Sequence, residues 1–289
     1  MLYGKPPLTY QQQAVLLTSR GLDCGDHERT IEWLQRIGYY RLSAYFIPFR
    51  VPGTDNFRPG TTLDQVVNLY KFDCSLRLLL LQALDRIEVG VRAVITYRLA
   101  HELGAFGHTV PGNFNPGYDH AYLMRTLTAE EQRSTELFVR HYRTRYTSEA
   151  HLPIWMATEL LSFGVLSKMY ANLRTGVRKR IAMEFGQPEA VFTSWVHALA
   201  AIRNTCAHHG RLWNRPLAVK PQLPNQWMSK KIDNRRIYVI ALIVDALLTR
   251  ISPDSKWKER LKAEVTAYPS VDLSAMHFPL NWQSVPPWK

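Results

Sequence analysis

The sequence predicts an all-α protein, and two features of it carry this prediction. Apolar residues recur at the three- and four-residue spacing of helices along almost the whole chain, whereas alternation with a period of two is confined to a few positions. Residues 62–103 contain no proline and a single glycine, Gly90, which is typical of one long helix or of two helices joined by a slight bend. We expect this segment to be the spine of the molecule.

The residues before the long helix predict two shorter helices and an aromatic cluster. The first helix covers about residues 9–19 and begins at Thr9, a suitable N-cap, and the second covers about residues 26–37. The aromatic residues within 39–46 are expected to pack against the long helix. Residues 51–60 are rich in glycine, proline, asparagine and aspartate, which indicates a loop.

The residues after the long helix predict several more helices separated by proline- and glycine-containing loops. In chain order, these helices are expected over residues 118–147, 153–173, 177–185, 188–210 and 235–250. The last 20 or so residues hold four prolines and are expected to lie extended over the surface. We divide the chain into an N-terminal helical segment (1–60), a helical core (61–250) and a C-terminal extension (251–289).

The composition excludes several classes of protein. Of the 289 residues, 46% are hydrophobic and 21% are charged, which excludes a chain that is disordered throughout. No apolar run reaches the roughly 18 residues that a membrane-spanning helix needs, and the first ten residues lack the apolar core of a secretion signal. The three cysteines have no Cys-x-x-Cys spacing, which argues against a disulfide framework. We therefore expect a cytoplasmic protein with no membrane partner.

The positive charge is concentrated in one part of the chain. The formal net charge is +12, and residues 168–236 hold 13 lysines and arginines against three acidic residues. Such a local surplus is typical of a protein that binds a polyanion, of which nucleic acid is the commonest. Runs of like charge are also found on ordinary solvated faces, so this alternative stays open.

Within and beside this basic segment, we predict a set of residues that contact RNA. Cationic and aromatic side chains alternate at Arg211, Trp213 and Arg215. Proteins that bind single-stranded RNA use such cations to contact phosphates and such rings to stack on bases. Trp213 is equally suited to fill the core. The remaining candidates for phosphate contact are Arg174, Arg178, Lys179, Arg180, Lys230, Lys231, Arg235 and Arg236.

The sharpest local feature is the run Arg203-Asn204-Thr205-Cys206-Ala207-His208-His209 at the end of a predicted helix. An imidazole can transfer a proton near neutral pH, a guanidinium can hold phosphate oxygens, and an amide can orient either partner. These groups suffice to cleave RNA without a metal ion, through attack of the ribose 2′-hydroxyl on the adjacent phosphorus. The products would be a 2′,3′-cyclic phosphate and a 5′-hydroxyl, and DNA would be inert. The alternative is that the cationic residues only cap the end of a helix.

The sequence predicts neither a metal site nor a cofactor. Cys206, His208 and His209 cluster, and Cys24 lies three residues before His27, but neither group supplies four ligands at the spacing of a zinc site. No glycine-rich phosphate loop precedes a helix in a β-α-β context.

Several segments resemble, in the same order, the motifs of the Abi-like abortive infection proteins of the AbiD/AbiF type, which belong to the HEPN superfamily. The resemblance covers roughly residues 8–220 and includes the signature of an arginine, a polar residue and a histidine, here Arg203, Asn204 and His208. The segments that carry it are Leu34–Tyr45, Tyr70–Asp73 with Leu76 and Arg77, Arg86–Val89 with Arg92, Ser162–Ser167, and Ile202–Arg215.

The resemblance implies a HEPN-type helical bundle with additional N-terminal helices and a C-terminal helical extension. It also implies a metal-independent ribonuclease that acts in defence against phage by damaging RNA. Such nucleases commonly face two motifs toward each other, and this chain holds one complete motif, so we expect a homodimer that pairs two copies of His208. Some members are associated with a structured noncoding RNA, which the basic segment would suit.

We expect further residues to support the site. Glu88 and Arg92 are four residues apart, in the order that favours an ion pair on a helix. They form a structural pair or orient His208 from a neighbouring helix, and His209 is a second supporting candidate.

Together, these observations favour an abortive-infection toxin that is a metal-independent endoribonuclease. The alternative is a non-catalytic RNA-binding protein that serves as a ribonucleoprotein scaffold or phage sensor.

Overall fold

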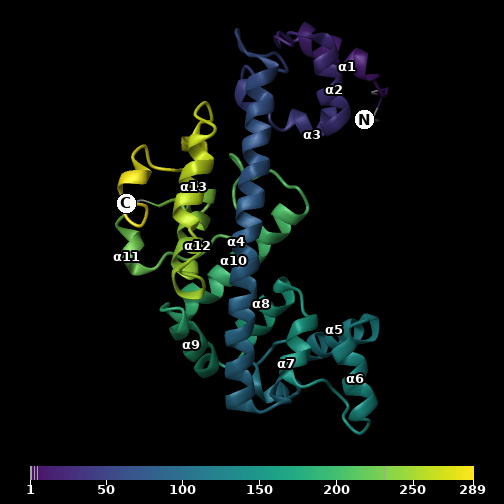
Figure 1. The fold of residues 1–289 in the computed structure, drawn as a ribbon, viewed down its shortest axis with the longest axis vertical. Coiled ribbons are helices and arrows are strands. Elements are labelled where there is room, and N and C mark those ends of the chain that lie inside the picture. The colour runs from purple at the N-terminus through teal and green to yellow at the C-terminus, as the bar shows by residue number, and fades with distance from the viewer. Residues whose placement is uncertain (1, 3, 5, 231) are drawn as a thin grey trace. The chain divides into compact units, whose positions relative to one another are not determined.

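The computed structural model describes residues 2, 4, 6–230 and 232–289, and within them it contains thirteen α-helices and no sheet (Figure 1). Three isolated β-bridges are the only extended pairings in this part of the chain. The all-α prediction is therefore confirmed. No helix among the described residues combines the length and the apolar character needed to cross a membrane.

The chain forms two compact units. The first comprises the residues up to Leu78 together with Arg260–Asp272, and the second comprises Leu79–Glu259 together with Leu273–Lys289. Two of the three boundaries fall inside helices, α4 (Leu63–Leu103) and α13 (Trp257–Thr266), and the third comes directly before the 3₁₀ turn Leu273–Met276. The division of the sequence at residues 60 and 250 stays a prediction.

The first unit contains three short helices and the start of α4. These helices are α1 (Tyr10–Ser19), α2 (His27–Ile37) and α3 (Tyr39–Ser43). The predicted N-cap of α1 is present, since the hydroxyl of Thr9 accepts from the backbone of Gln12 within a capping box. Helix α2 is capped in a similar way by the side chain of Asp26, which accepts from the backbone of Glu28. Local sequence chemistry thus sets where both helices begin.

The aromatic cluster packs against α4, as predicted, and it does so around a buried ion pair. Asp73 and Arg77, one turn apart on α4, are 0% and 5% exposed and bond each other. The hydroxyl of Tyr45 donates to Oδ2 of Asp73 at 2.7 Å, and the Tyr45 ring meets that of Tyr70 edge-on. Burial and the neighbouring carboxylate raise the pKa of Tyr45, so its hydroxyl stays protonated and continues to donate.

The second unit contains the rest of α4 and the helices that carry the candidate site. Their bounds are α5 (His120–Arg133), α6 (Leu137–Arg145), α7 (Ile154–Ala157), α8 (Phe163–Asn172), α9 (Thr175–Glu184), α10 (Glu189–Ala207), α11 (Asn225–Met228) and α12 (Ile237–Ile251). Helix α10 packs against both α8 and α9. Helix α12 is buried over most of its length, which fits its almost wholly apolar sequence.

Helix α4 is continuous over 41 residues, so the segment is one long helix and is not divided at Gly90. The glycine has a packing role instead. A Cβ atom built at this position would lie 2.6 Å from Cγ2 of Ile251, at the end of α12. The missing side chain therefore lets α12 approach the backbone of α4 closely.

The structure corrects two predicted helices. The segment 153–173 is broken into α7, a 3₁₀ turn (Thr158–Leu160) and α8. The break comes at Ser162, whose extended backbone and side-chain bond to the amide of Val165 make it the N-cap of α8. The segment 118–147 is likewise divided into α5 and α6 at Ser134, which is also extended.

The structure also corrects the prediction for the C-terminal residues. They do not lie extended over the surface, because a helix, α13, is followed by two 3₁₀ turns whose aromatic side chains are buried. Trp282 and Trp288 are 3% and 1% exposed, and the indole of Trp288 donates to the hydroxyl of Tyr238 on α12. The prolines indicated irregular backbone correctly, but burial of the tryptophans determines where that backbone lies.

A buried carboxylate on α12 leads to a pH-dependent prediction. Burial raises the pKa of Asp245 from 3.8 to about 6, although Nζ of Lys258 lies 3.8 Å away. Because the folded-state pKa is the higher one, the contribution of Asp245 to stability is fully present below about pH 4 and is lost as the pH rises through 6. We expect Asp245→Asn to raise the free energy of unfolding by up to about 3 kcal/mol at pH 8 and by only about 1 kcal/mol at pH 4.5. Urea unfolding at the two pH values measures this, and a gain independent of pH would contradict it.

Candidate functional site

The candidate site lies at the C-terminal end of α10, and the buried face of this helix fixes its position. Trp195, Leu199, Ile202 and Cys206 form the apolar stripe that the sequence predicts, and none is more than 6% exposed. Nε1 of Trp195 also donates to a backbone carbonyl at 2.9 Å. Opposite this stripe, Asn204 and Ala207 of the last turns are exposed and Arg203 is partly exposed.

The helix ends in a hydrogen-bonded cap that reverses the chain direction. The amide of Gly210 donates to the carbonyl of Thr205 at 2.7 Å, and the amide of His209 donates to that of Cys206 at 3.0 Å. These are the two bonds of a Schellman motif. Its left-handed position is taken by His209, with φ of 57°, where a glycine is usual. His208 is consequently the last residue before the chain turns back.

This backbone conformation leads to a prediction about stability. A residue with a side chain disfavours positive φ by about 1 kcal/mol, so we expect His209→Gly to raise the free energy of unfolding by about 0.5–1 kcal/mol. The matched control is His208→Gly, at φ of −92°, which we expect to be destabilising. Chemical unfolding compares the two variants. A loss of stability in His209→Gly would mean that the contacts of its side chain outweigh the backbone strain.

A shared carboxylate holds the arginine of the motif. Glu88 on α4 contacts Nη2 of Arg92 at 2.8 Å through one oxygen and Nε of Arg203 at 3.5 Å through the other. Arg92 is buried, and its second terminal nitrogen donates to the backbone carbonyls of Thr158 and Leu161. The Glu88–Arg92 pair that the sequence spacing predicts is therefore present. Its further contact is with Arg203.

The histidine and the amide of the motif are both exposed. The imidazole of His208 makes no hydrogen bond or ion pair with any described residue. The Arg203 side chain is 40% exposed and reaches Oδ1 of Asn204 only at 3.5 Å. The structure thus brings Arg203, Asn204 and His208 to one helix end, and Glu88 reaches Arg203 without bonding His208.

Comparison with known protein families identifies the family of this chain. The family model described as Abi-like protein matches residues 32–214, which is more than half of the chain. The chain belongs to the Abi-like protein family. No curated protein and no solved structure matches it. The matched range contains Glu88 and Arg92 as well as the whole motif at the end of α10.

Several basic residues of this Abi-like protein that were predicted to contact RNA are taken up in ion pairs. Nη1 of Arg178 lies 2.9 Å from Glu189, and Arg180 bonds Glu102 near the end of α4. Nε of Arg235 lies 3.0 Å from Oδ1 of Asp233. A phosphate would therefore have to compete with a carboxylate for each of these three guanidinium groups.

The other predicted RNA contacts differ in how accessible they are. Trp213 is 3% exposed, so its ring fills the core and offers no face to a base. Lys179, Arg215 and Lys230 are exposed. Arg174 and Arg236 reach protein oxygens, those of Gly112 and Asn214. Arg211 is partly buried, and Lys231 lies outside the described residues.

Sequence reasoning missed the groups that support the motif of the Abi-like protein. The carbonyls of Thr158 and Leu161, which hold Arg92, become available only because the predicted helix 153–173 is interrupted there. The Ser162-Phe163-Gly164 sequence was the available signal for this break. The left-handed His209 had no comparable signal, since its conformation follows from the cap.

Within the described part of the chain, no group of three or more histidine, cysteine, aspartate or glutamate side chains is placed to hold a metal ion. The histidines of the motif are therefore not joined there by the acidic or thiol ligands that a zinc site would require.

Proposed function

We propose that this Abi-like protein is an abortive-infection toxin that acts as a metal-independent endoribonuclease of the HEPN type. One observation carries the proposal: the end of α10 presents an unbonded, exposed imidazole, His208, together with the guanidinium of Arg203. A histidine used only to cap the helix would direct its ring to the last carbonyls. The ring of His208 makes no such bond and is available to a substrate.

The proposed reaction is transfer of the phosphorus to the neighbouring ribose oxygen. His208 takes the proton of the 2′-hydroxyl as that oxygen attacks the phosphorus, and the bond to the 5′-oxygen breaks. Arg203 stabilises the charge that develops on the non-bridging oxygens, and Asn204 orients the substrate. The 5′-oxygen receives a proton as it leaves, which gives a 2′,3′-cyclic phosphate and a 5′-hydroxyl.

Glu88 contributes by placing the arginine. Its carboxylate is itself held by the buried Arg92, so one ion pair anchors the second. Because the contact with Arg203 is long, the guanidinium keeps donors free for phosphate oxygens. Such preorganisation lowers the reorganisation that charge stabilisation would otherwise require.

A homodimer would supply the second histidine that the reaction requires as an acid. An outward-facing stripe on α4 supports this assembly, since Val89 and Tyr97 are 61% and 58% exposed and Ala93 lies between them at a spacing of four residues. Exposed apolar side chains one turn apart form a continuous surface suited to a second copy. This stripe is adjacent in sequence to Glu88, so pairing there would bring two motifs near each other.

RNA is the partner in this proposal, as substrate and as a bound noncoding RNA that controls the toxin. The surplus of positive charge in residues 168–236 supports both roles. Lys179, Arg215 and Lys230 are exposed candidates for phosphate contact, and none of them forms an ion pair with a carboxylate among the described residues.

The test identifies the chemical groups at the ends of the RNA fragments that cleavage would produce. The purified protein is incubated with a single-stranded RNA and with the same sequence carrying 2′-deoxyribose throughout, in the presence of EDTA. We expect cleavage of the RNA alone, with 2′,3′-cyclic phosphate termini identified by mass spectrometry. Binding of both oligonucleotides without cleavage of either would favour the RNA-scaffold alternative, and 5′-phosphate products would contradict the mechanism.

A further inference from the structure

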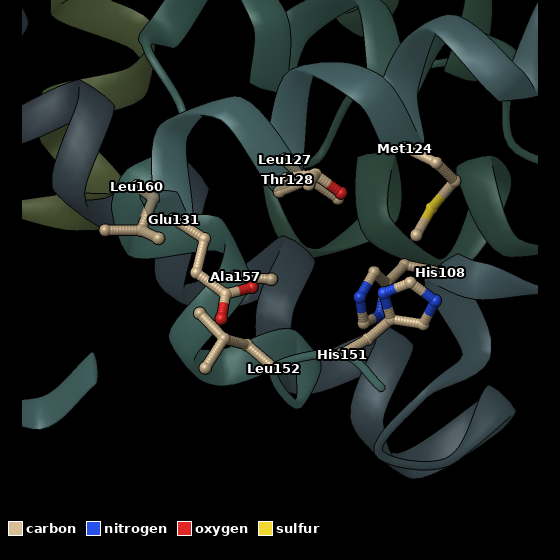
Figure 2. A pocket seen from close by; sticks show the side chains of 9 residues that line it. All are labelled: His108, Met124, Leu127, Thr128, Glu131, His151, Leu152, Ala157 and Leu160. Atoms are coloured by element: carbon tan, nitrogen blue, oxygen red, sulfur yellow. The ribbon is translucent and has the colours of Figure 1, made fainter. Parts of the chain in front are cut away.

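Two cavities in the second compact unit of the Abi-like protein contain no residue of the motif at the end of α10, and they differ in size. The smaller one, about 10 Å³, has room for about one water molecule and is lined mostly by apolar side chains (Figure 2). The larger one has a volume of about 350 Å³, and sites for small molecules typically measure about 300–1,000 Å³. The larger cavity is therefore the candidate for a ligand site.

Rigid apolar rings form most of the wall of the larger cavity. Trp227 of α11 and Tyr238 of α12 line it and are only 9% and 4% exposed. The ring of Trp227 also stacks on that of Trp195 of α10, with the two ring centroids 5.3 Å apart. The prolines in this wall are Pro279, Pro286 and Pro287. Because flat, fixed rings are well complemented by another flat ring, the wall favours an aromatic ligand.

The indole of Trp227 supplies a hydrogen-bond donor that no described residue uses. Buried tryptophans usually pair this N–H group, and those of Trp195, Trp257 and Trp288 each donate to a protein oxygen. Nε1 of Trp227 makes no hydrogen bond with a described residue, although this tryptophan is nearly as buried as the other three. An acceptor oxygen on a ligand would give this donor its partner.

The charge at the cavity selects an anion. Lys230 is the only charged residue among the described residues that line the cavity, and it forms no ion pair with a described carboxylate. Its backbone amide donates to the carbonyl of Trp227 at 3.0 Å, so a single turn of backbone holds this lysine beside the tryptophan. The cavity thus offers one positive charge and an unused N–H group at the edge of an otherwise largely apolar space.

These properties together define the class of ligand. A carboxylate carries one negative charge and two acceptor oxygens, which matches one ammonium group and one indole N–H group. An aromatic ring matches the wall, and a small molecule matches the volume. We propose that this cavity binds a small aromatic carboxylic acid, with its ring against Trp227 and Tyr238 and its carboxylate at Lys230. The site does not depend on the proposed nuclease chemistry.

The experiment compares two ligands that share a ring system and differ in charge. 2-Naphthoate and its neutral amide, 2-naphthamide, are titrated separately into the full-length protein, whose eight tryptophans carry ¹⁵N in the indole ring. The variant Trp227→Phe identifies the signal of Trp227. We expect both ligands to shift this signal to saturation, with naphthoate binding about fivefold more tightly, as an exposed ion pair allows. In Lys230→Met, the two ligands are expected to bind with equal affinity.

Matched variants separate the cavity from general binding. Lys179→Met removes an exposed lysine of α9 and is expected to keep the fivefold preference. Val285→Trp places a large ring in the cavity from a half-buried position of its wall and is expected to abolish both shifts. The other indole signals show whether each variant is folded.

Several results would overturn the proposal. They are a Trp227 signal that naphthoate does not shift, equal affinities of the wild type for the acid and the amide, and binding that persists in Val285→Trp. A shift of the Trp227 signal when the protein alone is diluted would also overturn it, because a second copy of the chain would then be the occupant of the cavity.

Discussion

Replacing His208 with alanine is expected to lower the rate of RNA cleavage by about 10²–10⁴-fold, the range typical for loss of a general acid or base. The same change is expected to leave the melting temperature nearly unchanged, because the imidazole is exposed and bonds no described residue. RNA affinity should also be retained, since the arginine and the exposed lysines remain. Single-turnover cleavage, a binding titration and thermal unfolding of one preparation measure these three quantities.

The matched control for this variant is His197→Ala, which removes an exposed histidine from the same helix. It should cleave RNA like the wild type. Equal losses of cleavage in both variants would show that the effect reflects α10 as a whole, and a full rate in His208→Ala would remove this residue from the mechanism. In cells, only the His208 variant is expected to lose toxicity.

The largest expected effect on stability comes from the first compact unit. Replacing Asp73 with alanine is expected to lower the free energy of unfolding by about 3–5 kcal/mol, because it leaves Arg77 charged in a buried environment. The guanidinium would keep its contacts with the hydroxyl of Tyr45 at 3.4 Å and with Sγ of Cys74 at 2.9 Å. Neither is a charged partner. Since whole domains are stable by only about 5–15 kcal/mol, this loss would remove a large share of the stability of the protein.

Asp64→Ala is the comparison for this second prediction. Asp64 is also on α4 and is also paired with an arginine, Arg29, but both side chains are about half exposed. Surface pairs contribute little, so the stability of this variant should be close to that of the wild type. Urea unfolding followed by tyrosine fluorescence tests both variants. Similar losses in the two would mean that burial is not what makes the Asp73–Arg77 pair important.

The sequence predicts the fold well where local chemistry decides it. Thr9, Asp26 and the uninterrupted residues of α4 mark element ends and lengths through capping and propensity, which act over a few residues. The C-terminal residues are different. Trp288 is buried through its contact with Tyr238 of α12, 50 residues earlier in the chain, and Trp282 packs on Trp288. The periodicity of a sequence does not reveal such contacts.

The candidate site, too, can be predicted from the sequence only where neighbouring residues on one helix determine it. The motif and the Glu88–Arg92 pair can be identified from spacing along one helix. The contact between Glu88 and Arg203 cannot, because it joins residues 115 positions apart. The cap that ends α10 at His208 depends on a left-handed histidine, which sequence propensities disfavour. The ion pairs of Arg178 and Arg180 likewise cannot be predicted from spacing, because their carboxylate partners lie on other helices.

The carboxylate shared by Arg92 and Arg203 also constrains how relatives of this chain can diverge. A member that loses the acidic residue at position 88 would retain two neighbouring cations, one of them buried, with nothing between them. Loss of the arginine at position 203 would instead leave the acidic residue satisfied by its remaining partner. As relatives diverge, loss of the arginine at position 203 should therefore precede loss of the acidic residue at position 88. Pairs of positions in contact covary among homologues. We expect homologues that lack the acidic residue at position 88 to lack the arginine at position 203 as well, whereas homologues that lack only the arginine should be found.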